Sequence, residues 1–218
     1  MKRIYEKDHG NTNEAEIVNI DREFDNSILF AKKLYFENGI FIYPTDTVYG
    51  LGGNPFNEKV VNRISIIKGR ASSKKYILLI DDISTLINYV EIKSEKHYDF
   101  LISLWPNPVS VVMTLNKKTS GLLKSDTAAF RIPHNRFCSN LLENLKMPLV
   151  STSVNRSNKI PLNEFSQIHD EFSTEVEAIF YSEKKSFTTA STLIDLTKEK
   201  PVLIREGKIK FEKILQRF

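Results

Sequence analysis

Cysteine is almost absent from the chain, and long hydrophobic runs are absent altogether. Among its 218 residues there is one cysteine, Cys138, which excludes an internal disulfide framework and a zinc site built from several thiolates. No segment approaches the roughly 18 to 20 uncharged apolar residues that span a membrane. Residues 1–19 mix acidic and basic side chains without the apolar segment of a secretory signal. We therefore expect a protein of the reducing cytoplasm that does not enter a membrane.

Motifs for several common chemistries are missing as well. The chain contains no G-x-x-x-x-G-K-[ST] phosphate loop and no G-x-S-x-G nucleophile turn. The four histidines lie far apart, without the spacing of metal ligands: His9, His97, His134 and His169. We expect no metal site formed by protein side chains, and we expect Cys138 to pack in the interior rather than to act as a nucleophile.

The composition is that of an ordinary globular domain with a mild basic excess. Hydrophobic residues make up 41% of the chain and charged residues 27%, which is enough apolar material for a sizeable core. There are 31 lysines and arginines against 27 acidic residues, a net charge of +4. Such a charge favours a phosphate-bearing ligand or a local nucleic-acid surface over a protein that coats DNA.

Helical and strand-like segments interleave along the chain without a long linker. Apolar residues at helical spacing predict helices over residues 27–38, 57–68, 94–104 and 136–146, with a closing turn at 211–215. Short β-branched and aromatic runs predict strands over 40–43, 76–80, 109–115, 128–132, 148–150, 191–196 and 202–205. This alternation predicts one α/β domain with a mixed sheet.

Residues 43–53, between Tyr43 and Gly53, form a polar and glycine-rich segment directly after a predicted strand. The segment contains three of the eight glycines of the chain, together with two threonines, an acid and two tyrosines. Glycines in such a turn would let a ligand approach the backbone closely, while hydroxyl groups would bind it. A glycine-rich turn that only connects two strands is the alternative, and the two interpretations are nearly balanced.

Two further segments place basic and polar side chains at the ends of a predicted helix and a predicted strand. Lys68 and Arg70 flank the glycine that ends a predicted helix, where both cations could reach one polyphosphate, although a solvated basic face is the usual meaning of such a run. Residues 151–158 follow a strand and carry seven polar side chains in eight positions, either as ligands at a strand end or as turn formers. Arg131, inside an apolar strand, requires an anionic partner, and Arg205 repeats this arrangement.

Taken together, these segments resemble the YrdC/Sua5 family of threonylcarbamoyl-AMP synthases. The family pattern is Y-P-T-[DE]-T-x-Y-G-L-G, K-x-R, a strand ending in R, S-x-N, S-T-[VL]-x-D and L-R-x-G. The chain has matching segments in the same order: Tyr43 to Gly52, Lys68 with Arg70, Arg131, Ser153 with Asn155, Ser191 to Asp195, and Ile204 to Gly207. The first motif is highly specific, and six in sequence leave little room for coincidence.

The resemblance implies a fold, an activity and partners. The fold would be a single α/β domain with a twisted mixed β-sheet flanked by helices, over residues 25–218, with residues 1–24 as an extension packed on or near it. The activity would be formation of threonylcarbamoyl-adenylate and pyrophosphate from L-threonine, bicarbonate and ATP, for the threonylcarbamoyl-adenosine modification of tRNA. A downstream threonylcarbamoyl-transfer machinery would use the product, and direct tRNA binding stays open.

The resemblance also assigns roles to individual residues. The residues that would bind the substrate threonine are Thr47, Arg131, Ser153 and Ser191. The residues that would bind ATP are Lys68, Arg70, Thr127, Asn155 and Arg205. The residues that would stabilise the reacting groups are Lys68, Arg70, Ser153 and Asn155. Mg²⁺ is expected with ATP, held mainly by phosphate oxygens and water rather than by protein side chains.

The chain departs from the family pattern at a few positions, and two other functions stay open. Lys74 stands where many members have an ATP-contacting asparagine, Leu79 where they have a threonine-contacting histidine, and Asn163 where a threonine is common. Asn158 replaces a frequent glycine and tolerates positive φ better than most residues. A non-catalytic module that binds tRNA or double-stranded RNA would use the same basic surface without the polar pocket. An adenylating enzyme for another small amino or hydroxy acid is the second alternative.

Overall fold

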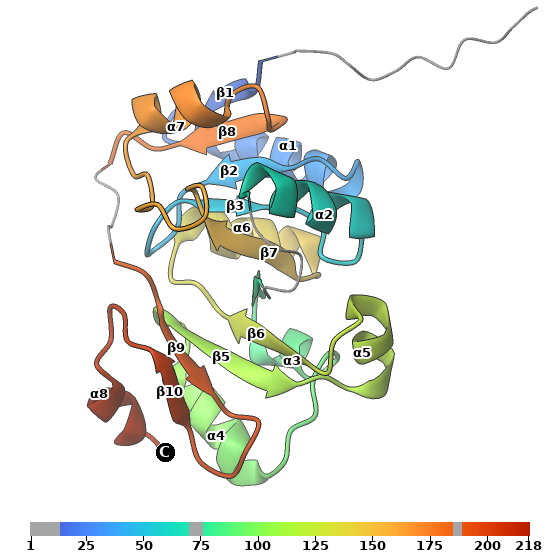
Figure 1. Cartoon of the computed structure of the whole chain (residues 1–218), viewed down its shortest axis with the longest axis vertical. Coiled ribbons are helices and arrows are strands. Elements are labelled where there is room, and N and C mark those ends of the chain that lie inside the picture. Colours follow the sequence, from blue (N-terminus) through green and yellow to red (C-terminus); the bar gives the residue numbers. More distant parts are fainter. Residues whose placement is uncertain (1–13, 70–75, 185–188) are drawn as a thin grey trace, which may run out of the picture.

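The computed structural model describes residues 14–69, 76–184 and 189–218 (Figure 1). The strands of this part of the chain are β1 (Glu16–Asn19), β2 (Phe41–Tyr43), β3 (Gly50–Gly52), β4 (Ile77–Leu79), β5 (Val109–Thr114), β6 (Thr127–Arg131), β7 (Leu149–Ser153), β8 (Ala178–Tyr181), β9 (Thr192–Asp195) and β10 (Val202–Arg205). Its helices are α1 (Phe24–Phe36), α2 (Glu58–Ile67), α3 (Ile83–Leu86), α4 (Glu95–Leu104), α5 (Lys117–Leu123), α6 (Arg136–Leu145), α7 (Phe165–Phe172) and α8 (Phe211–Leu215).

The strands form a single mixed sheet. Its order is β1-β8-β2-β3-β7-β4-β6-β5-β9-β10, with parallel pairs β1/β8, β2/β8, β4/β6 and β5/β9 among antiparallel ones. The sheet twists along its length, so that β2 and β8 run across the view of Figure 1 while β5 and β9 run obliquely. The prediction of one α/β domain with a twisted mixed sheet flanked by helices is confirmed.

The two faces of the sheet are covered by different helices. On one face, side chains of α1 and α6 pack with Phe41, Tyr43, Leu79 and Leu149 in one apolar cluster. On the other face, α2, α4 and α7 pack against Ile42, Leu51 and neighbouring strand residues in a second cluster. Alternation of side chains across a strand explains the division, because Tyr43 and Ile42 are sequence neighbours that point to opposite faces.

Helix α2 ends where the sequence predicts. Asn57 caps it, with its side-chain oxygen accepting hydrogen bonds from the backbone N–H groups of Lys59, at 2.9 Å, and Val60. Gly69 then takes a left-handed conformation with φ +58°, and its N–H donates to the carbonyl of Ile66 at 2.8 Å. The cap and the terminal glycine fix the position of Lys68 at the last turn.

Two of the three glycines of the segment over residues 43–53 lie in a strand rather than in a turn, while residues 44–49 form the loop between β2 and β3. Gly50 to Gly52 form β3, which pairs antiparallel with β2 and β7 and is fully buried. A Cβ atom on Gly52 would lie 1.9 Å from the carbonyl oxygen of Val150, and one on Gly50 would lie 2.8 Å from the ring of Tyr43. These glycines admit the packing of neighbouring protein groups rather than the approach of a ligand.

Several elements were not predicted from the sequence. Besides β3, they are β1, β8, α3, α5 and α7. β1 lies within residues 1–24 and pairs with β8 at the edge of the sheet, so this part of the expected extension belongs to the domain sheet.

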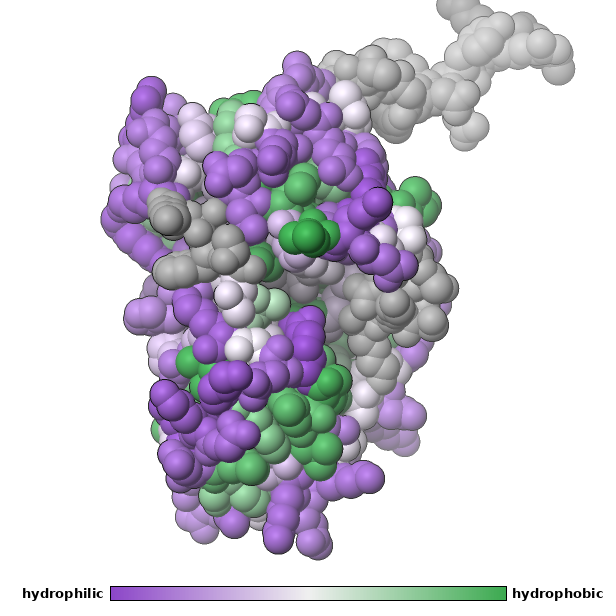
Figure 2. Space-filling view, turned by 60° about the vertical axis from the view of Figure 1, so that its left-hand side comes forward, coloured by the Kyte–Doolittle hydropathy of each residue, from purple (hydrophilic) through white to green (hydrophobic). Residues whose placement is uncertain are grey.

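The opposite edge of the sheet is formed by β10. Figure 2 shows the side of the molecule that carries this edge, with hydrophilic residues over most of its upper part and apolar residues gathered lower down. Val202 and Ile204 of β10 are 51% and 52% exposed, so the outer edge is open to solvent.

Candidate active site

Polar side chains from distant parts of the chain line one cavity of about 340 Å³. The walls come from the loop after β2, the end of α2, the ends of β6 and β7, and the segment before β9. Seven residues predicted for the site meet there: Thr47, Lys68, Arg131, Ser153, Asn155, Ser191 and Arg205. The gathering of these residues in one cavity is the geometric condition that the predicted substrate and ATP contacts require.

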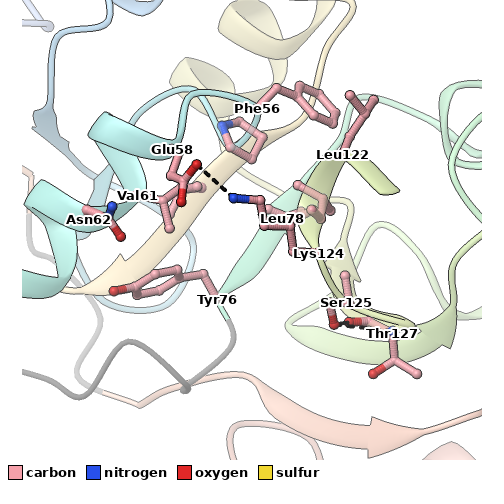
Figure 3. A pocket seen from close by; sticks show the side chains of 14 residues that line it. Phe56, Glu58, Val61, Asn62, Tyr76, Leu78, Leu122, Lys124, Ser125 and Thr127 are labelled. Carbon is pink, nitrogen blue, oxygen red and sulfur yellow. Dashed lines mark hydrogen bonds and ion pairs between the residues drawn. The ribbon is translucent and has the colours of Figure 1, made fainter. Parts of the chain in front are cut away.

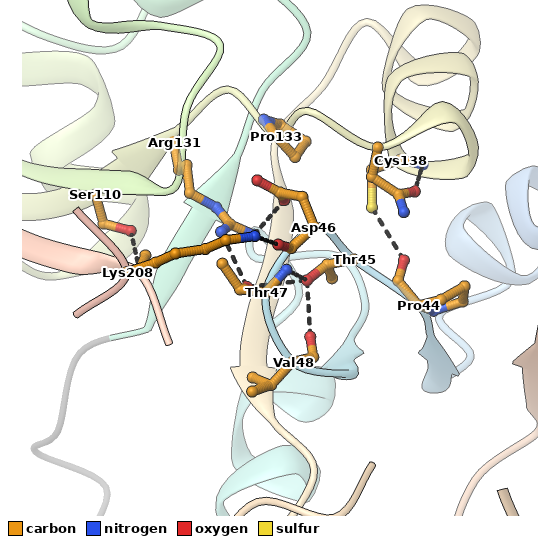
Figure 4. Close-up of polar contacts among 12 residues, drawn as sticks. Pro44, Thr45, Asp46, Thr47, Val48, Ser110, Arg131, Pro133, Cys138 and Lys208 are labelled. Carbon is orange, nitrogen blue, oxygen red and sulfur yellow. Dashed lines mark hydrogen bonds and ion pairs between the residues drawn. The ribbon is translucent and has the colours of Figure 1, made fainter. Parts of the chain in front are cut away.

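The loop that carries Thr47 is held by its own hydroxyl groups. Thr45 Oγ1 donates to the carbonyl of Val48 at 2.7 Å and accepts from the backbone N–H of Thr47 at 3.0 Å. The two threonine hydroxyl oxygens are 3.0 Å apart. A side chain that bonds the backbone two or three residues on is a local turn former, and here it presents Thr47 to the cavity (Figure 4).

Arg131 ends β6 and is buried at the cavity wall. Its Nη1 donates to Thr47 Oγ1 at 3.0 Å, and its Nη2 lies 3.4 Å from Asp46 Oδ1 (Figure 4). The side chains of Arg131 and Asp46 are 4% and 7% exposed. Asp46 is therefore the anionic partner that we expected for this arginine.

Lys68 lies on the same cavity, at the end of α2. It is 3% exposed, and its ammonium group donates to the carbonyl of Ser153 and to Asn155 Oδ1, the latter at 2.6 Å. Ser153 Oγ also donates to Asn155 Oδ1 at 2.6 Å. The predicted catalytic lysine, serine and asparagine thus form one hydrogen-bonded group.

The turn after β7 is tied to the end of α2. The backbone N–H of Ser157 donates to the carbonyl of Lys68 at 2.7 Å, and the guanidinium of Arg156 donates to the carbonyl of Ile67. Asn155 Nδ2 donates to the carbonyl of Lys159 at 2.5 Å. Asn158 has φ 65°, so it adopts the left-handed conformation expected for it.

Ser191 and Arg205 complete the wall on the side of β9 and β10. Arg205 Nη2 donates to the carbonyl of Ser191 at 3.0 Å, and the hydroxyls of Ser191 and Ser110 are 2.9 Å apart. Arg205 is exposed as a residue, but partial burial of its guanidinium lowers its pKa. Within the described residues its hydrogen-bond acceptor is a carbonyl rather than a carboxylate, so the acid expected beside this strand arginine is not seen.

Thr127 lines a second cavity rather than the first. This second cavity, of about 410 Å³, lies between the start of α2 and the end of α5, where Glu58 and Lys124 form an ion pair at 2.9 Å (Figure 3). Tyr76 lines both cavities, which are therefore neighbours. The structure places Thr127 apart from the other predicted ATP contacts described above.

The structure describes two of the four remaining positions that the sequence analysis named, Leu79 and Asn163. Arg70 and Lys74 lie outside the described residues, so the ATP contact predicted for Arg70 and the effect of the Lys74 departure stay predictions. Leu79 is fully buried in the apolar cluster behind β4, where its backbone pairs with Arg131. Asn163 Nδ2 donates to the carbonyl of Pro161 at 3.2 Å, and Pro161 belongs to the cavity wall.

Two residues near the site were not assigned a role from the sequence. Asp46 belongs to the first motif, where it was noted only as an acid in a turn. Lys208 follows the last motif directly, and its ammonium group donates to the backbone carbonyl of Asp46 at 3.1 Å. No local pattern could have revealed this contact, because the two residues are 162 positions apart.

Comparison with known proteins identifies the family of the chain. The Sua5/YciO/YrdC family model, described as telomere recombination, matches residues 33–207. The chain belongs to this family. It is 28% identical over 201 residues to the threonylcarbamoyl-AMP synthase of Pyrococcus abyssi, which is 91% of the chain and 59% of that relative. The chain therefore spans less than two thirds of the length of this curated relative.

Solved structures of the family have the same fold. A crystal structure of Pyrococcus abyssi Sua5 complexed with L-threonine has a TM-score of 0.84 at 28% identity, covering 92% of this chain and 60% of that one. Escherichia coli YciO has a TM-score of 0.80 at 23% identity, covering 92% of this chain and all of that one, and supports the fold alone. Among the described residues, no helix of this Sua5/YciO/YrdC chain is long and apolar enough to cross a membrane.

Proposed function

We propose that this chain is a threonylcarbamoyl-AMP synthase, which forms threonylcarbamoyl-adenylate and pyrophosphate from L-threonine, bicarbonate and ATP. The product would serve the threonylcarbamoyl-adenosine modification of tRNA. The observation that carries the proposal is the cavity that brings Thr47, Arg131, Ser153 and Ser191 together with Lys68 and Arg205. The similarity to a synthase from Pyrococcus abyssi, whose structure has been solved with L-threonine, supports it.

The lining of the cavity offers two kinds of binding group, which suit two substrates. The buried guanidinium of Arg131, which donates to the hydroxyl of Thr47 and shares the cavity lining with Ser191, can bind the carboxylate of an amino acid. Lys68 and Arg205 provide cationic donors for a polyphosphate on the same cavity. We assign the first group of residues to threonine and the second to ATP.

The reaction requires positioning and charge stabilisation rather than a protein nucleophile. The amine of threonine attacks the carbon of carbon dioxide and loses a proton, or attacks bicarbonate with loss of water, and forms a carbamate in either case. A carbamate oxygen then attacks the α-phosphorus of ATP, the bond from this phosphorus to the bridging oxygen breaks, and pyrophosphate leaves. Lys68, held by Ser153 and Asn155, would stabilise negative charge that develops on the phosphates.

Mg²⁺ is proposed as the companion of ATP. The described lining of the cavity offers hydroxyl and amide oxygens and no carboxylate, and no group of three metal-binding side chains occurs in that part of the chain. Such a lining fits a magnesium ion held by phosphate oxygens and water, with at most a minor contribution from Thr47 or Ser153 oxygens. The ion would supply charge neutralisation at the phosphates.

Pyrophosphate release tests the proposed function. We expect release from ATP that depends on both L-threonine and bicarbonate, and a product with the mass of threonylcarbamoyl-adenylate. Equal release without threonine, or faster release with another amino or hydroxy acid, would contradict the substrate assignment. Tight binding of tRNA without any release would favour the RNA-binding alternative, which would not require the polar cavity.

A further inference from the structure

Asp46 is a buried carboxylate next to the arginine assigned to the substrate. Its Oδ1 lies 3.4 Å from Arg131 Nη2, and within the described residues neither of its carboxylate oxygens accepts a hydrogen bond. A buried charge is costly unless another charge compensates it. Arg131 therefore compensates Asp46, through a close ion pair that lacks hydrogen bonds.

Asp46 contacts Arg131 from outside the cavity. Thr47 and Arg131 both belong to the described cavity lining, and Asp46 does not. Figure 4 shows the Asp46 side chain beside the Arg131 guanidinium, with Thr47 next in the loop. The Asp46 side chain therefore reaches the cavity lining through its contact with Arg131.

The backbone of Asp46 is held by a residue beyond β10. Lys208 Nζ donates to the carbonyl of Asp46 at 3.1 Å, while the backbone N–H of Lys208 donates to the carbonyl of Ala190 at 2.9 Å. Ala190 belongs to the cavity lining. Asp46 is thus held both at its side chain, by Arg131, and at its backbone, by Lys208, and cannot easily follow a moving arginine.

The guanidinium of Arg131 retains hydrogen-bonding capacity for a substrate. Its Nη1 donates to Thr47, whereas its Nε has no acceptor within the described residues. Because the Asp46 pair lacks a hydrogen bond, it sets the orientation of the group without occupying these donors. Without Asp46, a single hydrogen bond to Thr47 would remain among the described polar contacts of this long side chain.

We propose that Asp46 is a positioning residue, which holds Arg131 in the orientation that binds the carboxylate of the amino acid substrate. The inference rests on the proposed function, since it takes that carboxylate to be the partner of Arg131. It adds a residue that touches neither substrate. Its effect is confined to the amino acid and does not extend to ATP.

Asp46→Asn tests the inference, because it removes the charge and keeps the size of the side chain. We expect the KM for L-threonine to rise roughly 5- to 10-fold, the range that loss of one immobilised long side chain implies. The KM for ATP stays within about 2-fold, because the ATP contacts do not involve Arg131. Asp46→Glu restores the carboxylate and returns the threonine KM toward the wild-type value. An unchanged or lower threonine KM in Asp46→Asn overturns the inference, as does an equal rise for ATP.

Asp81→Asn is the matched control. Asp81 is 8% exposed and pairs with Lys146 at 2.9 Å, so the substitution makes the same chemical change at similar burial. We expect it to leave both KM values unchanged. If Asp46→Asn does not fold, Lys208→Gln carries the test, since Lys208 is exposed and holds the Asp46 backbone. It raises the threonine KM and leaves the ATP KM unchanged, and the opposite pattern overturns the inference.

Calorimetric binding separates failure of the inference from failure of the proposed function. Wild-type protein that binds no L-threonine contradicts the proposed function itself. Wild-type and Asp46→Asn proteins that bind L-threonine equally contradict only the role of Asp46. L-Threoninamide, which lacks the carboxylate, should bind equally to both, and a loss of its binding in Asp46→Asn would show that Asp46 acts on another group.

Discussion

Lys68 Nζ and Asn155 Oδ1 are joined by a hydrogen bond of 2.6 Å, although the two residues are 87 positions apart. The bond fixes the ammonium group at the end of α2 against the turn that follows β7. Because Ser153 donates to the same asparagine oxygen, all three side chains have defined positions before any ligand binds. Donors fixed in advance are the kind that stabilise developing charge without reorganisation.

Lys68→Ala should therefore lower kcat by about 10²-fold, as expected when one preorganised donor to a developing charge is lost. Pyrophosphate release is the measurement, with thermal unfolding to show that the variant is folded. Lys59→Ala, at an exposed position of the same helix, is the control and should keep wild-type turnover. Wild-type turnover in folded Lys68→Ala would remove Lys68 from the catalytic group.

Gly52→Ala should destabilise the protein strongly. The added Cβ would lie 1.9 Å from the carbonyl oxygen of Val150, a backbone atom that cannot move without breaking the β3–β7 pairing. We expect a loss of about 3 kcal/mol or more, measured by urea unfolding, and a melting temperature lower by roughly 6 to 12 °C.

Gly121→Ala is the control for this substitution. Nothing lies within 4 Å of the position of its Cβ, and Gly121 is inside helix α5. Alanine there should be neutral or stabilise the protein by up to about 1 kcal/mol. Equal stability of Gly52→Ala and wild type would mean that β3 and β7 are not packed as described.

The contrast between α2 and β3 shows how far sequence patterns reach. Helix α2 is specified locally, by its Asn57 cap, its apolar spacing and the terminal Gly69, and the prediction was confirmed to within one residue at either end. Strand β3 has glycines, which disfavour strands when considered alone. Only the ring of Tyr43 and the carbonyl of Val150, brought in by other strands, explain them.

The candidate site divides in the same way. Polar runs at element ends and a buried arginine could be found by inspection, and the structure brings seven of the named residues into one cavity. Nothing in the sequence indicates that Asp46 is the ion-pair partner of Arg131, or that Lys208 reaches the same loop. These contacts depend on the pairing of β6 with β4 and β5, which no local pattern encodes.

Cys138 should be unreactive in the folded protein. Burial raises the pKa of its thiol, and the nearby Asp46 carboxylate raises it further, so the thiolate that reacts with alkylating reagents is scarce at neutral pH. We expect alkylation at pH 8 to be at least about 100-fold slower in the folded than in the urea-unfolded protein. Ser139→Cys, at the exposed neighbouring position, should add one rapidly reacting thiol. Rapid alkylation of folded wild type would contradict the burial of Cys138.

Stability should fall as pH rises above about 8.5, because the folded state retains protons that the unfolded state loses. Burial raises the pKa values of Tyr43 and Tyr35 as well as that of Cys138. In the unfolded state the thiol deprotonates near pH 8.5 and the phenols near pH 10. Above its own unfolded-state pKa, each group lowers the unfolding free energy by up to about 1.4 kcal/mol per pH unit.

Tyr43→Phe isolates one phenol of this set. The variant loses the hydrogen bond from the Tyr43 hydroxyl to the carbonyl of Val150, which lowers stability at every pH. Above pH 10 the stability of the variant should fall less steeply than that of wild type, with a slope smaller by about 1.4 kcal/mol per pH unit. Urea unfolding between pH 8 and pH 11 gives both slopes. Tyr98→Phe, at a position that is 38% exposed, is the control and should keep the wild-type slope. Parallel slopes for Tyr43→Phe and wild type would show that the Tyr43 phenol ionises in the folded protein, contrary to its complete burial between α6 and the sheet.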